Sequence, residues 1–160
     1  MNGQKSLHPH ASPRERSGEA ETGGSTSGRT SQWSDYIHVL LDRGHASRCA
    51  IYSKRGQQWA ASGPDFAVGK KQFRAIMQGF QDAAELRCVG LQLADVSFTL
   101  TRLANRNCMM IGRCAATGSG CIIYKCRRCV VIATHEDAVQ PGACFSGMEK
   151  LGDFLVDRGY

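Results

Sequence analysis

The chain has 160 residues, 42% of them hydrophobic and 21% charged, which is enough for one globular domain with a core of its own. Its formal net charge of +6 favours an acidic partner: nucleic acid, an anionic membrane surface or an acidic protein. No stretch reaches the roughly 18 apolar residues of a membrane span, and the first 30 residues hold no apolar run typical of a signal peptide. We therefore expect a cytoplasmic protein.

The N-terminal segment, residues 1–32, is rich in Gly, Ser, Thr, Arg and Glu and has no periodic apolar pattern. Such a segment cannot bury enough apolar surface to offset the entropy lost on ordering. We therefore expect a disordered extension over 1–32, followed by a domain over 33–160. The domain opens with apolar residues at helical spacing, which predicts a helix that Gly44 would end: Trp33, Tyr36, Ile37, Leu40 and Leu41.

Two β-like runs, residues 49–53 and 58–61, flank a turn, and a second helix is predicted over residues 70–80. Short apolar runs with the spacing of an antiparallel meander then follow: residues 91–93, 98–100, 108–113, 120–125 and 130–134. Gly118-Ser119-Gly120 and Arg127-Arg128 fall between strands and predict turns, although arginine lacks the positive-φ preference of a two-residue hairpin loop. A last helix follows Pro141, so terminal helices enclose an antiparallel sheet in an α+β domain.

The eight cysteines allow several interpretations. Cys126 and Cys129 form a CxxC motif, and with Cys114 and Cys121 four thiolates could hold a tetrahedral zinc ion. The adjacent arginines could instead lower a thiol pKa for redox chemistry. A second CxxC motif is missing, however, and strands rather than a helix flank the first one. We interpret the cysteines as buried hydrophobic residues and expect no metal site, with a labile Cys126–Cys129 disulfide as the alternative.

Enzymatic and nucleic-acid-binding functions find little support in the sequence. Gly118-Ser119-Gly120 is too short for a phosphate-binding P-loop and lacks its lysine. Arg127-Arg128 alone does not form the basic stripe with interleaved aromatics that binds nucleic acid. The histidines have no spacing with Cys, Ser or Asp that would build a catalytic triad or a metal site: His8, His10, His38, His45 and His135. We therefore expect neither an enzyme nor a cofactor.

Several short motifs occur in the order and spacing of the profilin family, which this chain resembles over residues 33–160, most closely its short fungal and protist members. The motifs are Trp33-x-x-Tyr36, Trp59-Ala60, Ile76-Met77-Gln78-Gly79-Phe80 followed by Gly90-Leu91, Ile111-Gly112-Arg113, Val139-Gln140-Pro141-Gly142, and Leu151-Gly152-Asp153-Phe154-Leu155 ending in Gly159-Tyr160. The resemblance implies a central antiparallel sheet packed between the N- and C-terminal helices and shorter helices on the other face.

The resemblance also implies a groove for proline-rich ligands. A polyproline II helix is preformed, so flat aromatic faces with a few hydrogen-bond donors are sufficient to bind it. Without the resemblance, an ordinary core is the better interpretation of these aromatic side chains. The residues that the resemblance places on the groove are Trp33, Tyr36, Trp59, Phe154 and Tyr160.

A second implied site is a basic and polar face that contacts monomeric actin. Arg102, Arg113 and Lys125 lie at or near strand ends, where alternation could direct several of them to one sheet face. Arginine pairs bidentately with carboxylates, and actin is acidic overall. The alternative is an ordinary solvated surface. The implied contacts on the last helix are Gly142, Phe145, Ser146, Glu149 and Lys150.

The function implied is a cytoskeletal adaptor that sequesters monomeric actin, delivers it to growing barbed ends and promotes its nucleotide exchange. Its other partners would be proline-rich proteins such as formins and, through the positive face, phosphatidylinositol bisphosphate at the membrane surface. Two alternatives stay open: a diverged relative that binds only proline-rich peptides or anionic lipid, and a cysteine-rich zinc or thiol sensor.

Overall fold

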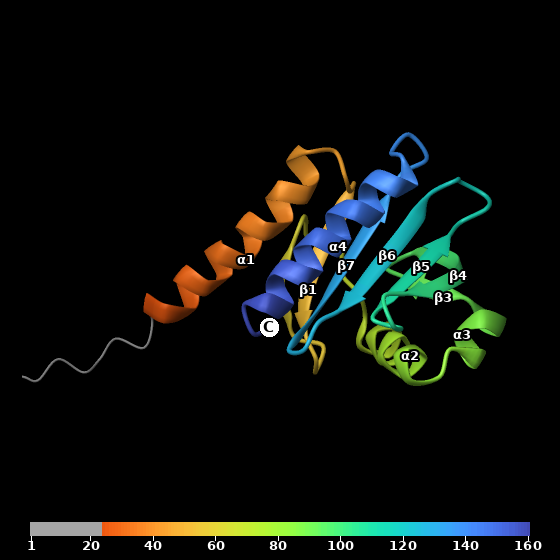
Figure 1. The fold of residues 1–160 in the computed structure, drawn as a ribbon, viewed down its shortest axis with the longest axis horizontal. Helices are drawn as coiled ribbons and strands as arrows, with labels where there is room; N and C mark the ends of the chain where they lie inside the picture. Colours follow the sequence, from red (N-terminus) through yellow and green to blue (C-terminus); the bar gives the residue numbers. More distant parts are fainter. Residues whose placement is uncertain (1–23) are drawn as a thin grey trace, which may run out of the picture.

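The computed structural model describes the backbone of residues 24–160 and the side chains of residues 32–160. Its centre is one antiparallel sheet in the strand order β2-β1-β7-β6-β5-β4-β3 (Figure 1). The strands are β1 (Arg48–Ser53), β2 (Gln58–Ala61), β3 (Leu91–Leu93), β4 (Val96–Ala104), β5 (Met109–Arg113), β6 (Gly120–Lys125) and β7 (Cys129–His135). Helices α1 (Gly24–Asp42) and α4 (Pro141–Asp157) cover one face, and α2 (Lys70–Gln81) and α3 (Ala84–Val89) cover the other. The predicted α+β fold is confirmed.

Alternation along the strands builds a separate core on each face of the sheet. In β6, Ile122 and Tyr124 pack towards α1 and α4, whereas Cys121 and Ile123 pack towards α2. This is the period-two pattern of a strand buried on both faces, and it explains why the meander reads as nearly continuous apolar runs. The two helical layers therefore present independent outer surfaces.

The start of α1 differs from the prediction. The helix begins at Gly24, whereas the apolar pattern placed the start of structure at Trp33. The reason is that the pattern marks where the helix packs on the sheet, and helical backbone continues N-terminally into polar sequence. The helix thus extends into residues 24–32 of the segment that was expected to be disordered, while residues 1–23 lie outside the described part of the chain. At the other end of the helix, the predicted stop is confirmed, because Gly44 adopts φ +68°.

Three local features went beyond the sequence pattern. Helix α3 was not predicted. Strand β4 extends beyond the predicted residues 98–100, and a bulge after Leu100 interrupts the alternation that would have marked its second half. The turn at Arg127-Arg128 forms without positive φ at either arginine. It is held instead by two hydrogen bonds, from Cys126 N to Cys129 O at 2.9 Å and from Arg127 N to Tyr160 O at 2.8 Å.

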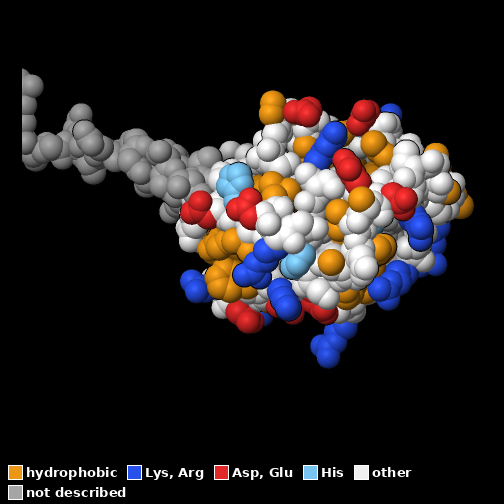
Figure 2. Space-filling model, turned by 90° about the horizontal axis from the view of Figure 1, so that it is seen from above, with side chains coloured by type: hydrophobic (Ala, Val, Ile, Leu, Met, Phe, Trp, Pro, Cys, Tyr) orange, Lys and Arg blue, Asp and Glu red, His pale blue; other side chains and the backbone are white. Residues whose placement is uncertain are grey.

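Figure 2 views the molecule from above Figure 1, onto the end that carries the α1–β1, β5–β6 and β7–α4 loops. Acidic, basic and apolar side chains are interspersed there. No helix within residues 24–160 is long and apolar enough to cross a membrane.

Candidate functional site

An aromatic cluster forms where α1, β2 and the end of α4 meet. The ring centroid of Trp33 lies 4.7 Å from that of Trp59, 4.8 Å from that of Tyr160 and 5.7 Å from that of Tyr36. Tyr36 in turn lies 5.6 Å from Phe154. The structure thus brings together all five aromatic residues that the sequence analysis assigned to one groove. We call them the aromatic cluster.

Burial divides the aromatic cluster into a floor and a surface. Trp33 is only 7% exposed and contacts three of the other rings, so it forms the floor. Tyr36, Trp59 and Tyr160 are half-buried, and Phe154 is exposed. The cluster therefore offers flat aromatic faces to solvent, which is the surface that a polyproline II helix needs.

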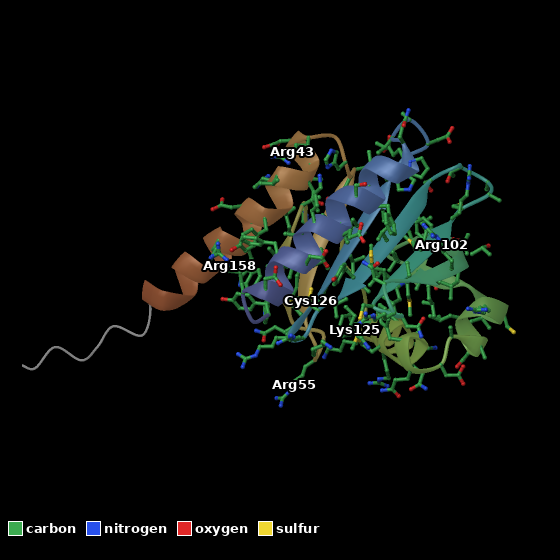
Figure 3. The ribbon with its side chains drawn as sticks, viewed as in Figure 1. Arg43, Arg55, Arg102, Lys125, Cys126 and Arg158 are labelled. Carbon is green, nitrogen blue, oxygen red and sulfur yellow. The ribbon has the colours of Figure 1, made fainter. Side chains whose placement is uncertain are left out.

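Polar groups border the aromatic cluster. Gln32 Nε2 donates a hydrogen bond to the Tyr36 hydroxyl at 3.0 Å, and the Arg158 guanidinium lies 4.6 Å from the Phe154 ring centroid. In the view of Figure 3, Arg158 is drawn over α1. The backbone N–H of Tyr160 donates to Leu155 O at 2.9 Å, which turns the end of the chain back onto the cluster. Amide and guanidinium donors thus lie beside the exposed rings.

The second predicted site forms on the face of the sheet that α4 covers. The Arg102 guanidinium lies 5.2 Å from the Phe145 ring centroid, and Asn105 Nδ2 donates to Glu149 Oε1 at 3.1 Å. Ile111 packs in the core under α4, so Arg113, two residues further along β5, projects to the same side. We call the exposed and half-buried residues on this side the α4 face: Arg102, Asn105, Arg113, Gly142, Phe145, Ser146, Glu149 and Lys150.

Lys125 does not join the α4 face. Its ammonium group lies 5.0 Å from the ring centroid of Phe80 on α2, across the sheet (Figure 3). The physical reason is alternation: Tyr124 faces α4, so the next residue must face the opposite side. Of the three predicted cations, Arg102 and Arg113 therefore share the sheet face that α4 covers, and Lys125 lies on the other side.

Lys125 belongs instead to a basic end of the molecule that the sequence did not reveal. Tyr52 and Lys125 both pair with Val130 of β7, so Lys54 lies near Lys125, and burial followed by the charge of Lys125 lowers the pKa of Lys54. A cavity of about 430 Å³ beside them is lined by Lys54, Arg55, Lys70 and Arg74. We call this surface the basic end: Lys54, Arg55, Lys70, Arg74, Lys125, Arg127 and Arg128. Its residues come from the β1–β2 turn, α2 and the β6–β7 hairpin, each of which alone carries too few charges to be recognised.

The cysteines do not form a zinc site. Cys121 lies in the core under α2, whereas Cys126 and Cys129 lie in the core under α4, so the four sulfurs weighed as ligands do not converge. Within the described residues, no group of three His, Cys, Asp or Glu side chains could hold a metal ion. All eight cysteines are free thiols.

Burial keeps three of the core thiols protonated. It raises the pKa of Cys144 to about 12 and also raises the pKa of Cys49 and Cys121. A hydrogen bond between Cys126 and Cys129 raises the pKa of the first thiol and lowers that of the second. Because the thiolate is the reactive form, the buried cysteines act as apolar core residues.

The sequence and the fold match one family. The profilin family model matches residues 31–160. Profilin-2 of Acanthamoeba castellanii is 29% identical over 129 residues, and the profilin of Saccharomyces cerevisiae is 31% identical over 129 residues. Each alignment covers 80% of this chain and 98% of the relative.

Solved structures agree. The crystal structure of Acanthamoeba castellanii profilin II superposes with a TM-score of 0.73 at 29% identity, covering 80% of this chain and 99% of the other. Mouse profilin IIa, solved in complex with a double repeat from the FH1 domain of mDia1, has the same fold, with a TM-score of 0.69 at 19% identity, covering 80% and 99%. The order of the sequence motifs, the fold shared with solved profilins and the match to the family model lead to one conclusion: the chain belongs to the profilin family.

Proposed function

We propose that this chain binds monomeric actin through the α4 face and thereby regulates filament assembly. The observation that carries the proposal is the packing of Arg102 on Phe145 beside Glu149, within a chain of the profilin family. A guanidinium held flat on an aromatic ring keeps its N–H edge free for a partner carboxylate, and its ordering entropy is already partly lost. The function comprises sequestration, delivery to growing barbed ends and nucleotide exchange on actin.

Arg113→Glu tests the actin surface. We expect the affinity for monomeric actin to fall by about tenfold or more, because a reversed charge at an interface repels acidic partner groups and slows encounter. The measurement is inhibition of spontaneous actin nucleation by the purified full chain, titrated against monomeric actin. Arg87→Glu on α3 is the matched control, because it makes the same charge change at an exposed position behind the sheet and should leave inhibition unchanged. Equal inhibition by all three proteins would remove the α4 face from actin binding.

The aromatic cluster supplies the second function, the binding of proline-rich segments such as those of formins. It lies at the junction of α1, β2 and the end of α4, whereas Arg102 and Arg113 lie on β4 and β5. Two separate faces allow a proline-rich segment to hold this chain while the chain holds actin. The segment would then raise the effective concentration of actin at a growing filament end.

We propose that the basic end binds phosphatidylinositol bisphosphate. Clustered Lys and Arg side chains near an anionic leaflet contribute about 1 kcal/mol each, and among the described residues no Asp or Glu lines the cavity at this end. Vesicles containing the lipid should bind the chain at low salt, and Lys125→Glu with Arg128→Glu should reduce binding by about tenfold or more. The same pair of changes should spare actin binding. If Arg113→Glu rather than the Lys125→Glu and Arg128→Glu pair abolished vesicle binding, the lipid site would lie on the α4 face.

One result would favour a narrower function. If the chain binds a proline-rich peptide or lipid vesicles but no actin at tens of micromolar, it is a diverged adaptor of the same fold.

A further inference from the structure

A second cavity, of about 480 Å³, lies at the end of the sheet opposite the basic end. It is formed where β1 begins and β7 ends, together with the β3–β4 and β5–β6 turns. This is the end seen in Figure 2. The volume is within the range of small-molecule sites, and none of its lining residues belongs to the aromatic cluster, the α4 face or the basic end.

The cavity has an apolar floor and a negatively charged rim. Its floor is made by side chains that are almost fully buried, Phe66, Leu93 and Phe98, with Val96 beside them. The charged residues that line it are three exposed carboxylates and one guanidinium: Asp95, Glu136, Asp137 and Arg48. An apolar body would be desolvated on the floor, and the excess of carboxylates favours a positive charge at the mouth.

His135 adds a hydrogen-bond acceptor to the cavity wall. The side chain is 5% exposed, and its Nδ1 lies 3.2 Å from the backbone oxygen of Glu136. A carbonyl oxygen only accepts, so Nδ1 carries a proton, and a ring without a second proton keeps a lone pair on Nε2. None of the hydrogen bonds among the described residues involves Nε2. Among the same residues, every side-chain nitrogen or oxygen that is fully buried has a hydrogen-bond partner, so an unpaired Nε2 cannot be fully buried. Nε2 lies beside Gly120 on a ring that lines the cavity.

We propose that this cavity binds an organic ammonium ion with an apolar body. The body would lie on Phe66, Leu93 and Phe98, while the ammonium group would donate to His135 Nε2 and to carboxylates of the rim. The acceptor and the carboxylates disfavour an anion. The neutral alcohol of the same shape could use the floor but would lose the attraction of the rim. The site is independent of actin, proline-rich and lipid binding.

The probe is 2-phenylethylammonium, titrated into the full chain and followed by two-dimensional ¹H–¹⁵N NMR. We expect saturable shift changes confined to residues that line the cavity. The uncharged 2-phenylethanol is the matched control ligand. Because it lacks the positive charge, its affinity should be lower than that of the amine by about tenfold or more. Equal affinity for the amine and the alcohol would overturn the proposal, as would no saturable change at millimolar concentrations or shifts centred on the aromatic cluster.

Asp95→Asn combined with Glu136→Gln tests the rim. Both side chains are exposed, so the variant should fold, and we expect it to bind the amine about fivefold more weakly while its affinity for the alcohol stays unchanged. Asp35→Asn on α1 makes the same kind of change far from the cavity and is the control. An unaltered affinity for the amine in the double variant would contradict the assignment of the rim.

Discussion

Trp59→Ala is expected to weaken the binding of a proline-rich peptide by about 30-fold or more, the loss typical of a central aromatic contact, and to leave actin binding unchanged. Trp59 is half-buried, and its ring centroid lies 4.7 Å from that of the buried Trp33. The substitution removes a stacking face and an indole N–H donor but leaves the floor of the cluster in place. Isothermal titration with a decaproline peptide measures the first effect, and inhibition of actin nucleation measures the second.

Two companion variants sharpen this experiment. Trp59→Phe keeps an aromatic face but loses the N–H donor, so its affinity should fall between those of the native chain and Trp59→Ala. Val89→Ala, at a residue that is 73% exposed on α3, is the control for an unrelated surface change. Undiminished peptide binding by Trp59→Ala would place the proline-rich site elsewhere. A parallel loss of actin binding would show that the substitution disturbs the fold instead.

Gly152→Ala is expected to lower the free energy of unfolding by about 2–3 kcal/mol, the cost of forcing an extra carbon into a closely packed core. Gly152 lies where α4 crosses β6, and a β-carbon there would overlap the ring of Tyr124. The ring cannot easily move, because it is buried and its hydroxyl donates to Asp153 Oδ1 at 2.6 Å. Since α4 carries both Phe145 and Phe154, the strain would also disturb the two proposed faces.

Gly142→Ala is the matched control in the same helix. A β-carbon at Gly142 would meet no atom within 4 Å, so the change adds only the better helix propensity of alanine. The free energy of unfolding should stay the same or rise by up to about 1 kcal/mol. Urea unfolding followed by circular dichroism measures both variants. A loss of similar size in the two would mean that contact with Tyr124 does not govern the effect, because alanine is the better helix former at both positions.

Much of the fold followed from local pattern. The helical stripe from Trp33 to Leu41, the alternating strands of the meander and the stop at Gly44 are set by side chains that interact within a few residues, so their signals are present in the sequence. The ordered profilin motifs added long-range information, and the five residues of the aromatic cluster were grouped correctly although α1, β2 and the end of α4 supply them.

Other features depended on the tertiary structure. The side of the sheet on which Lys125 lies is decided by which face Tyr124 occupies, and a run buried on both faces does not reveal that choice. The basic end and the cavity beside His135 are assembled from turns that are distant in sequence, so no local pattern marks them. The sequence alone therefore determined most of the elements and the family, whereas packing across the sheet decided which charges share a surface and which turns enclose a cavity.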